Sequence, residues 1–182
     1  MKKETILLVV VTLVIGVLVG VISSKTQKDS TTVNQVVTSV PAVNYQQKIQ
    51  ALEKIVSKEP DNRNAWVQLG HNYFDSNQTM KAIDAYDKAL ELDGMDPDVL
   101  TDQGIMYRRL GWYKKAIDNF SEASKLKPSH TQSLYNIGLV YRDDLHDVEK
   151  AKAAWTRYLE IAPAGDGADK VAVMLDHMEN GH

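Results

Sequence analysis

The stretch AWVQLGHNYF, residues 65–74, decides the fold of this chain. Spacings of three, one and three residues place three apolar side chains and a glycine on one face of a helix. These positions are Trp66, Leu69, Gly70 and Tyr73. After a short polar turn, the stretch KAIDAYDKALEL, residues 81–92, has an apolar face of its own. Together the two stretches predict a hairpin of two amphipathic helices.

The same positions recur along the chain at a fixed offset of 34 residues. They carry glycine, tyrosine, alanine or a second aromatic residue: Gly70, Gly104, Gly138; Tyr73, Tyr107, Tyr141; Ala82, Ala116; Tyr86, Phe120; and Ala89, Ala123. Beyond Tyr141 the offset becomes 35 and gives Ala151, Trp155 and Pro163. One residue is therefore inserted within RDDLHDVEK, residues 142–150. Self-similarity at this period predicts stacked helical hairpins.

Glycine inside a helix is less favourable than alanine by about 1 kcal/mol. Its recurrence at one phase predicts close approach of the second helix of each hairpin, with the small Ala82 and Ala116 supplying the other half of the contact. The aromatic residues are expected to fill the space between hairpins: Tyr73, Tyr86, Tyr107, Phe120 and Tyr141. The tryptophans are expected in the core and not in a cofactor site: Trp66, Trp112 and Trp155.

This pattern resembles the tetratricopeptide repeat, in which W-x2-L-G-x2-Y precedes an alanine, an aromatic residue, another alanine and a proline. The resemblance covers three repeats within residues 63–164. It implies an all-α fold, a superhelix of stacked helix pairs. The second and third units depart from the pattern at several positions: Leu100, Gln103, Leu134, Ile137 and Tyr158.

Two flanking segments are predicted to cap the repeats. Residues 44–62 include NYQQKIQALEKIVSKEP, which resembles the second half of a unit and has Lys48 where the first alanine would stand. Residues 165–182 include GADKVAVMLDHM, the predicted carboxyl-terminal capping helix. Tyr158, in place of the late alanine, indicates that something other than a standard repeat packs against this end.

An uncharged apolar run of 20 residues, TILLVVVTLVIGVLVGVISS, occupies residues 5–24. A helix of this length spans about 30 Å, the thickness of a bilayer core. We interpret it as a transmembrane signal-anchor that follows a cytoplasmic tail, residues 1–4. The alternative is a cleaved signal peptide, although residues 21–25 contain no small-x-small cleavage site. The polar residues 25–43 are expected to form a flexible linker.

Lys2 and Lys3 favour a cytoplasmic amino terminus. The expected location is therefore the inner (cytoplasmic) membrane, crossed once, with the carboxyl-terminal domain on the periplasmic side. Gly16 and Gly20 form a GxxxG pair, which would support at most a weak homodimer through the membrane helices.

Composition and motifs argue against several classes of protein. The chain has no cysteine, which rules out disulfide scaffolds, cysteine-ligated metal sites and covalent haem attachment. Its net charge of −3 argues against nucleic-acid binding. No catalytic motif is present, and His146 among Asp143, Asp144 and Asp147 is interpreted as a solvated turn. We predict no enzyme, no metal and no cofactor; chemistry in this acidic loop is the enzymatic alternative.

The resemblance also implies a binding surface, because the first helices of successive tetratricopeptide repeats line a groove that holds a peptide. We transfer the groove-lining positions of the family to the matching repeat positions of this chain. The first unit then contributes Asn64, Val67, Gln68, His71 and Phe74. The second unit contributes Asp98, Thr101, Asp102, Ile105, Arg108 and Arg109. The third unit contributes Gln132, Tyr135, Asn136, Leu139 and Arg142.

Within this predicted groove, an apolar strip lies beside the guanidinium groups of Arg108, Arg109 and Arg142. The strip consists of Val67, Phe74, Ile105, Tyr135 and Leu139. This combination suits an acidic or C-terminal peptide segment with hydrophobic anchors. Replacing Arg108 and Arg142 by alanine is therefore expected to weaken binding without lowering the melting temperature. The carboxylate clamp of chaperone-binding members of the family uses Lys and Asn at positions that differ here, so that specificity is not expected. Those positions are Val67, His71, Thr101 and Ile105.

These expectations combine into a membrane-anchored adaptor that binds a peptide segment of a cell-envelope partner. The arrangement is similar to repeat domains of bacterial cytochrome c maturation systems, and also to repeat proteins of secretion, pilus and division complexes. The alternative is a structural or assembly subunit that is permanently buried in such a complex.

Overall fold

The computed structural model describes residues 44–180. The expected anchor, the linker and the Gly16–Gly20 pair lie outside the described residues, so the topology stays a prediction. Among the described helices none is both long and apolar enough to cross a membrane.

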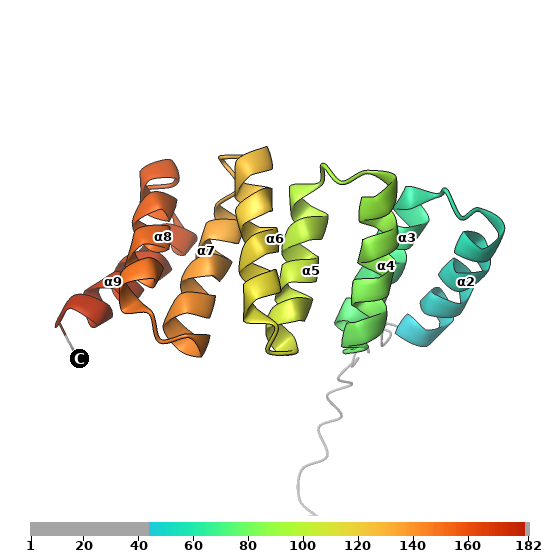
Figure 1. Cartoon of the computed structure of the whole chain (residues 1–182), viewed down its shortest axis with the longest axis horizontal. Helices are drawn as coiled ribbons and strands as arrows, with labels where there is room; N and C mark the ends of the chain where they lie inside the picture. Colours follow the sequence, from blue (N-terminus) through green and yellow to red (C-terminus); the bar gives the residue numbers. More distant parts are fainter. Residues whose placement is uncertain (1–43, 181–182) are drawn as a thin grey trace, which may run out of the picture. The chain divides into compact units, whose positions relative to one another are not determined.

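Every regular element of the described part is a helix, in agreement with the all-α prediction (Figure 1). Eight α-helices and one short π-helix follow one another: α2 Tyr45–Lys58, α3 Arg63–Asp75, α4 Thr79–Leu92, α5 Pro97–Arg109, α6 Tyr113–Leu126, α7 Thr131–Leu139, η1 Val140–Asp144, α8 Val148–Ile161 and α9 Asp166–Asn180. The three predicted hairpins are α3–α4, α5–α6 and α7–α8, and they stand side by side in one row.

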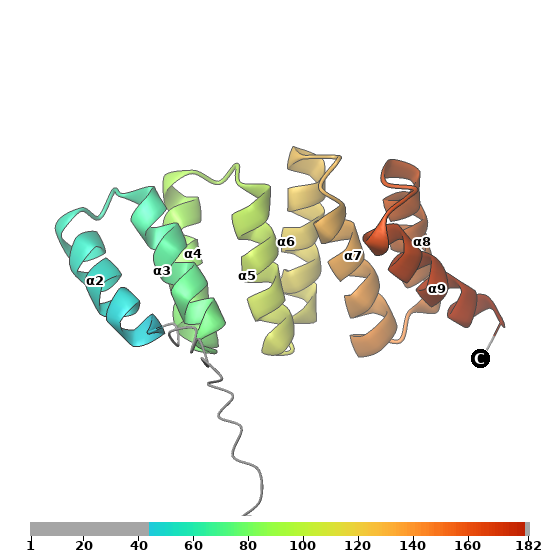
Figure 2. The same cartoon turned by 180° about the vertical axis from the view of Figure 1, so that it is seen from behind.

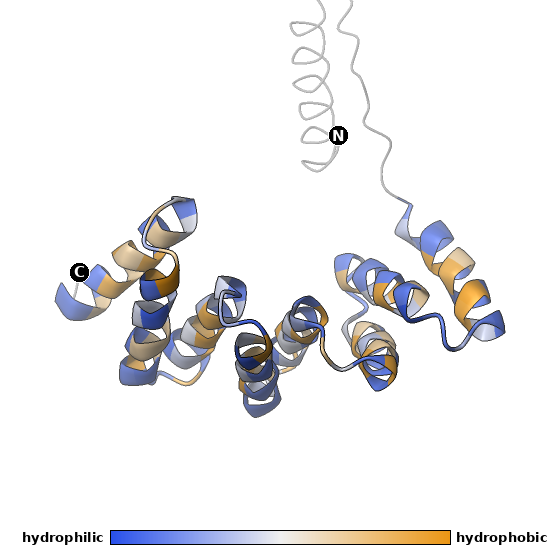
Figure 3. Cartoon of the chain, turned by 90° about the horizontal axis from the view of Figure 1, so that it is seen from above, coloured by the Kyte–Doolittle hydropathy of each residue, from blue (hydrophilic) through white to orange (hydrophobic). Residues whose placement is uncertain are grey.

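The row has two different faces. Helices α4, α6 and α8 face the viewer in Figure 1, whereas α3, α5 and α7 face the viewer in Figure 2. Seen from above, the row is curved, with α3, α5 and α7 on its inner side and with polar and apolar residues alternating along each helix (Figure 3). We call the side formed by α3, α5 and α7 the concave surface.

Each recurrent glycine is in close contact with an aromatic ring from the second helix of the same hairpin. A Cβ added at Gly70 would lie 3.0 Å or less from atoms of the Tyr86 ring. Gly104 meets Phe120 in the same way, and Gly138 meets the indole of Trp155. The atoms nearest to each glycine thus belong to a second-helix ring and not to the expected alanines, although Ala82 and Ala116 are themselves fully buried.

One helix flanks the three hairpins at each end. Helix α2 buries Ile49, Leu52 and Val56 against the first hairpin. Helix α9 buries Ala168 and Val171 at the other end. Tyr158 contacts α9 at Gly167, where an added Cβ would collide with the tyrosine hydroxyl. The late tyrosine of the third repeat thus fits this terminal helix, as its departure from the pattern predicted.

The third repeat accommodates its inserted residue in a turn of π-helix at the end of α7. The N–H of Leu145 donates to the carbonyl of Val140 at 3.0 Å, an i→i−5 bond that closes the π-helix η1. His146 follows with φ 55°, equivalent to Asn77 with φ 58° after α3. The acidic loop is therefore an ordered helix end followed by a turn, in which Asp143 and His146 are exposed to solvent as expected.

The three tryptophans differ in burial, which corrects one expectation. Trp155 is fully buried, and its Nε1 donates to the carbonyl of Tyr135 at 3.1 Å. Trp66 is half-buried and bonds to the Pro60 carbonyl. Trp112 is the residue that precedes α6, and 40% of its surface is exposed.

Candidate functional site

The residues predicted to line the groove all lie on α3, α5, α7 or η1, but they are not equally accessible. Six are exposed: Asn64, Gln68, His71, Asp98, Arg109 and Gln132. Eight are half-buried: Val67, Phe74, Asp102, Ile105, Arg108, Tyr135, Leu139 and Arg142. Thr101 and Asn136 are buried at 3% and 5% exposure.

The two buried polar residues bond to their own helices. Thr101 donates its hydroxyl to the carbonyl of Pro97 at 2.7 Å, and Asn136 donates its amide to the carbonyl of Gln132 at 2.9 Å. Their side chains are therefore not offered to a partner. The repeat spacing predicts that both residues lie on the first helix of their unit, which is where they are. It does not predict how deeply the neighbouring helices bury them.

The apolar strip is shared between the surface and the core. Val67, Phe74 and Ile105 pack against the buried core of the first two hairpins. Tyr135 packs beside the ring of Trp155, with 6.5 Å between ring centroids. These residues were expected on a face that packing does not require. Because they are half-buried, they offer a peptide only part of their apolar area.

All three predicted arginines are engaged within the chain. Arg108 donates to the carboxylates of Asp144 at 2.5 Å and Asp143 at 3.2 Å, which ties α5 to η1. Arg142 pairs with Asp143 at 2.5 Å and lies over the Trp155 ring. Two acidic side chains of the inserted loop thus neutralise two of the guanidinium groups.

The third arginine is held by a different helix. Arg109 lies 4.5 Å from the centroid of the Phe74 ring and within hydrogen-bonding distance of the Asn77 side chain. A cation over an aromatic face is attracted by the ring quadrupole. The three guanidinium groups therefore do not form a free cluster for a carboxylate.

Replacing Arg108 by alanine is expected to lower the free energy of unfolding by about 1–2 kcal/mol. The change leaves Asp144, with 19% of its side chain exposed, without its charged donor. Chemical denaturation of the full chain measures the effect, with the exposed Arg157→Ala as a control on α8. Equal stability of the Arg108→Ala and Arg157→Ala variants would show that the ion pair contributes nothing, and would restore the earlier expectation of an unchanged melting temperature.

Neighbouring first helices are joined by a second kind of polar contact. His71 Nε2 on α3 lies 3.1 Å from an Asp102 oxygen on α5, and His130 Nε2 lies 3.0 Å from an Asp98 oxygen. The hydrogen bond to Asp102 raises the pKa of His71, partly offset by burial, and the charges of Asp102, Asp75 and Asp96 add to the rise. The protonated form of His71 is thus favoured in the folded chain.

This raised pKa predicts a pH-dependent stability. Because His71 binds its proton more tightly when folded, its contribution is complete below the unfolded pKa of about 6.5 and disappears as pH rises through the folded pKa. We expect the stability difference between wild type and His71→Gln to be larger at about pH 5.5 than at about pH 8.5. Urea denaturation over this range measures it, with the exposed His177→Gln as control. A difference that does not change with pH would contradict the prediction.

A hollow lies between α3 and α5 on the concave surface. It is lined by His71, Phe74, Asp75 and Asp102. Asp75, the last residue of α3, is exposed and was not predicted as a site residue. The only signal for it in the sequence is its position directly after Phe74, which is not enough to separate it from an ordinary polar helix end. Within residues 44–180 no three His, Asp or Glu side chains gather closely enough to hold a metal ion.

The stacked hairpins and their curved inner surface define a superhelical helix-pair repeat protein, a class that interacts with other proteins. Family models described as "Tetratricopeptide repeat" match residues 67–130 and 131–164, which together are more than half of the chain. The chain belongs to the tetratricopeptide-repeat family.

Curated relatives match this chain over a small part of their own length. Protein O-mannosyl-transferase TMTC3 of Homo sapiens is 32% identical over 95 residues, 52% of this chain and 10% of that protein. Cytochrome c-type biogenesis protein CycH of Pseudomonas aeruginosa is 27% identical over 122 residues, 64% of this chain and 29% of that protein. The chain thus spans about a tenth to a third of these relatives.

Solved structures agree in fold. The crystal structure of MamA has a TM-score of 0.70 at 24% identity and covers 75% of this chain and 78% of that chain. The first tetratricopeptide-repeat domain of Spaghetti (RPAP3), bound to the HSP90 peptide SRMEEVD, has a TM-score of 0.59 at 24% identity, with 65% and 91% coverage. At this identity the likeness establishes the superhelical fold.

Proposed function

We propose that this chain is a membrane-anchored adaptor whose concave surface binds an extended peptide segment of a cell-envelope protein. The observation that carries the proposal is the curved inner surface of α3, α5 and α7, where exposed polar side chains lie beside half-buried apolar ones. Such a surface provides anchoring pockets and hydrogen-bonding groups along a peptide. The RPAP3 repeat domain, a structural neighbour, holds a peptide.

The proposed mechanism is tethering. Residues 5–24 would hold the chain in the inner membrane, and residues 25–43 would give the repeats freedom to move on the periplasmic side. Confinement near the membrane raises the effective concentration of the binding surface toward membrane-bound partners. No catalytic step is required of the chain itself, in keeping with its proposed role as an adaptor without enzymatic activity.

The name of CycH supports cytochrome c maturation as the setting, with an apocytochrome segment as the peptide. A chain without cysteine would then take no part in the thiol chemistry of its partner. Binding of an acidic peptide through Arg108, Arg109 and Arg142 loses its main support, because these side chains already have partners within the chain.

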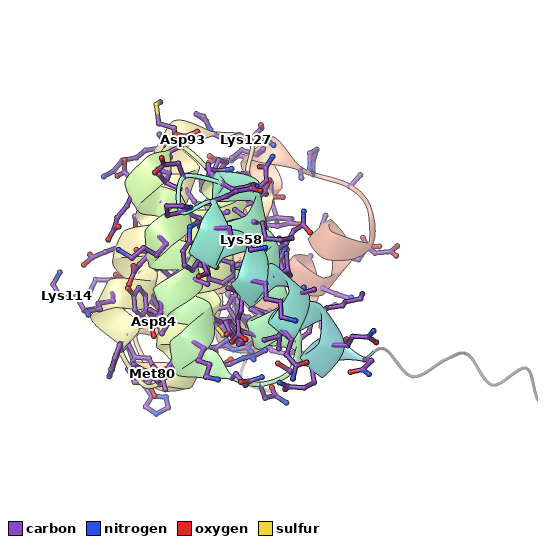
Figure 4. All side chains as sticks on the ribbon, turned by 90° about the vertical axis from the view of Figure 1, so that its right-hand side faces the viewer. Lys58, Met80, Asp84, Asp93, Lys114 and Lys127 are labelled. Carbon is purple, nitrogen blue, oxygen red and sulfur yellow. The ribbon has the colours of Figure 1, made fainter. Side chains whose placement is uncertain are left out.

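Site-specific photo-crosslinking tests the binding surface. The photoreactive residue p-benzoylphenylalanine is placed at Gln68 or Gln132, which are exposed on α3 and α7. Matched positions on the opposite helices are Asp84 on α4 and Lys114 on α6, both labelled in Figure 4. Irradiation of cells that express the full chain is expected to give the same discrete adduct from both concave positions and not from the outer ones. Adducts from the outer positions alone would overturn the proposal.

A reporter fused after His182 tests the topology separately. Alkaline phosphatase, which is active only outside the cytoplasm, is expected to be active in this fusion and to remain in the membrane fraction. Activity of a cytoplasmic reporter instead would contradict the periplasmic placement. Recovery of active alkaline phosphatase in the soluble fraction would indicate the cleaved signal peptide.

A further inference from the structure

The two end helices of the row each correspond to half of a repeat. Helix α2 packs on α3 as the second helix of a hairpin packs on the next unit, and α9 packs on α8 as a first helix does on the preceding unit. Within residues 44–180, α2 has no first helix before it and α9 has no second helix after it. Figure 4 looks along the row from one of these ends, with α2 nearest to the viewer.

Positions counted from the start of each helix match the end helices to the complete hairpins. The recurrent glycine and the ring that covers it both stand seven residues after the first residue of their helices, as Gly70 does in α3 and Tyr86 in α4. The equivalent residues are Val173 in α9 and Leu52 in α2. The sizes are thus exchanged: the first helix gains side-chain volume where the second helix loses a ring.

The face of α9 that a second helix would cover is exposed. In α3 this face carries the W-x2-L-G-x2-Y pattern, from Trp66 to Tyr73, and packs on α4. In α9 all four equivalent residues are exposed: Asp169, Ala172, Val173 and Asp176. Val173, with 54% of its surface exposed, is therefore an apolar centre between two carboxylates.

The matching face of α2 is exposed as well. Ala82 and Ala89, which stand three and ten residues after the first residue of α4, are fully buried. Their equivalents in α2 are Lys48 and Ile55. Both are exposed, Ile55 at 38%. This face of α2 therefore also combines an apolar side chain with a charged one.

The charges of the two end helices are opposite. Helix α2 contains three lysines and one glutamate, a net charge of +2. Helix α9 contains four carboxylates and one lysine, a net charge of −3 with its histidine neutral. The end surfaces are therefore complementary in charge, which favours contact of α2 with α9 and disfavours contact of two like ends.

The complete hairpins show which charged residues such a contact would pair. In each of them a lysine near the start of the second helix lies over the tyrosine near the end of the first, with 5.3 Å from Lys81 Nζ to the Tyr73 ring centroid in the first hairpin. In α9 the position of this tyrosine is taken by Asp176. In α2 Lys48 stands one residue beyond the position of the lysine. An ammonium would thus meet a carboxylate instead of a ring.

We propose that copies of this chain associate end to end, with α9 of one copy packed on α2 of the next as a hairpin formed between two molecules. The stacking of helices then continues across the contact, because a repeat protein uses one kind of neighbour interface along its whole length. The contact is heterologous, so each row keeps a free α2 and a free α9 and can add further copies. It does not depend on what the concave surface binds.

Cysteine crosslinking between mixed copies tests the contact, because the chain has no cysteine of its own. Full-length Val173→Cys and Ile55→Cys chains with different tags are mixed in mild detergent and treated with a short bismaleimide. We expect the mixture to give about ten-fold more crosslinked dimer than either variant alone. Met95→Cys, at a residue between α4 and α5 that is 75% exposed, replaces Val173→Cys in the matched control and should give no dimer above background.

Charge reversal tests the pairing of the two ends. Lys48→Glu in the Ile55→Cys chain should lower the yield of mixed dimer about ten-fold, and Asp176→Lys in the Val173→Cys chain should restore it. Lys114→Glu, on the outer surface of α6, is the control variant and should leave the yield unchanged. Thermal unfolding of each variant confirms that it is folded.

Three results would overturn the proposal. Equal crosslinking of Val173→Cys with itself would indicate a symmetric contact between two α9 helices. A dimer of equal yield with Met95→Cys would show that the copies meet without a preferred surface. Recovery of monomer alone would leave both end helices to solvent or to another protein. Failure of Asp176→Lys to restore the yield would contradict the pairing of Asp176 with Lys48.

Discussion

Replacing Trp155 by alanine is expected to lower the free energy of unfolding by about 3–5 kcal/mol, the largest single effect that the structure predicts. The indole is fully buried between α7 and α8. Its removal leaves a cavity beside Gly138, frees the Tyr135 carbonyl from its hydrogen bond and uncovers the guanidinium of Arg142. Chemical denaturation of the full chain in detergent measures the change.

A second tryptophan provides the matched control. Trp112 contacts Lys115 and Tyr107, but 40% of its surface is exposed. Trp112→Ala is therefore expected to cost less than about 1 kcal/mol. If the two variants were equally stable, the third repeat would not be closed by Trp155 and the packing described here would be wrong.

The variant Gly138→Ala is expected to lower the free energy of unfolding by about 1–3 kcal/mol, even though alanine is the better helix former by about 1 kcal/mol. A Cβ at this position would overlap the edge of the Trp155 indole, which is rigid and cannot move without disturbing the core. At Gly94 an added Cβ would meet only the Leu90 carbonyl oxygen at 3.5 Å, so Gly94→Ala is expected to be close to neutral.

A double-mutant cycle shows whether the indole is the cause. In the Trp155→Ala background the clash is gone, and Gly138→Ala is expected to stabilise the chain by up to about 1 kcal/mol. The sign of the effect thus reverses with the presence of Trp155. Additive effects of the two substitutions would instead indicate that the glycine is needed for its backbone and not for contact with the ring.

Recurrence of residues at a fixed offset was enough to predict the all-α repeat fold. The 34-residue spacing of Gly70, Gly104 and Gly138 reports a steric requirement, and such requirements repeat in every unit of a repeat protein. Tyr158 broke the pattern for a physical reason, because it packs on Gly167 of the capping helix. The residue that contacts each glycine could not be predicted from the sequence. The repeat spacing alone does not distinguish a small residue from an aromatic residue one helical turn away.

The candidate site was predicted less well, because its chemistry depends on contacts between units. The sequence places Arg108 and Asp144 36 residues apart, and only the π-helix in the inserted loop brings the carboxylate to α5. Asp75 lines the hollow from the last position of α3 and does not stand out by spacing. The sequence therefore predicts which helices form the surface, namely α3, α5 and α7. The distribution of charge on this surface depends on contacts that only the folded structure shows.

The central claim is that the concave surface holds a peptide, and mapping of a bound peptide by amide NMR tests it most directly. The peptide segment identified in the photo-crosslinked adduct is synthesised and titrated into isotope-labelled full chain in detergent. The account predicts that the largest chemical-shift changes fall in α3, α5 and α7. Changes confined to α4, α6 and α8 would contradict it, because those helices form the outer face of the row.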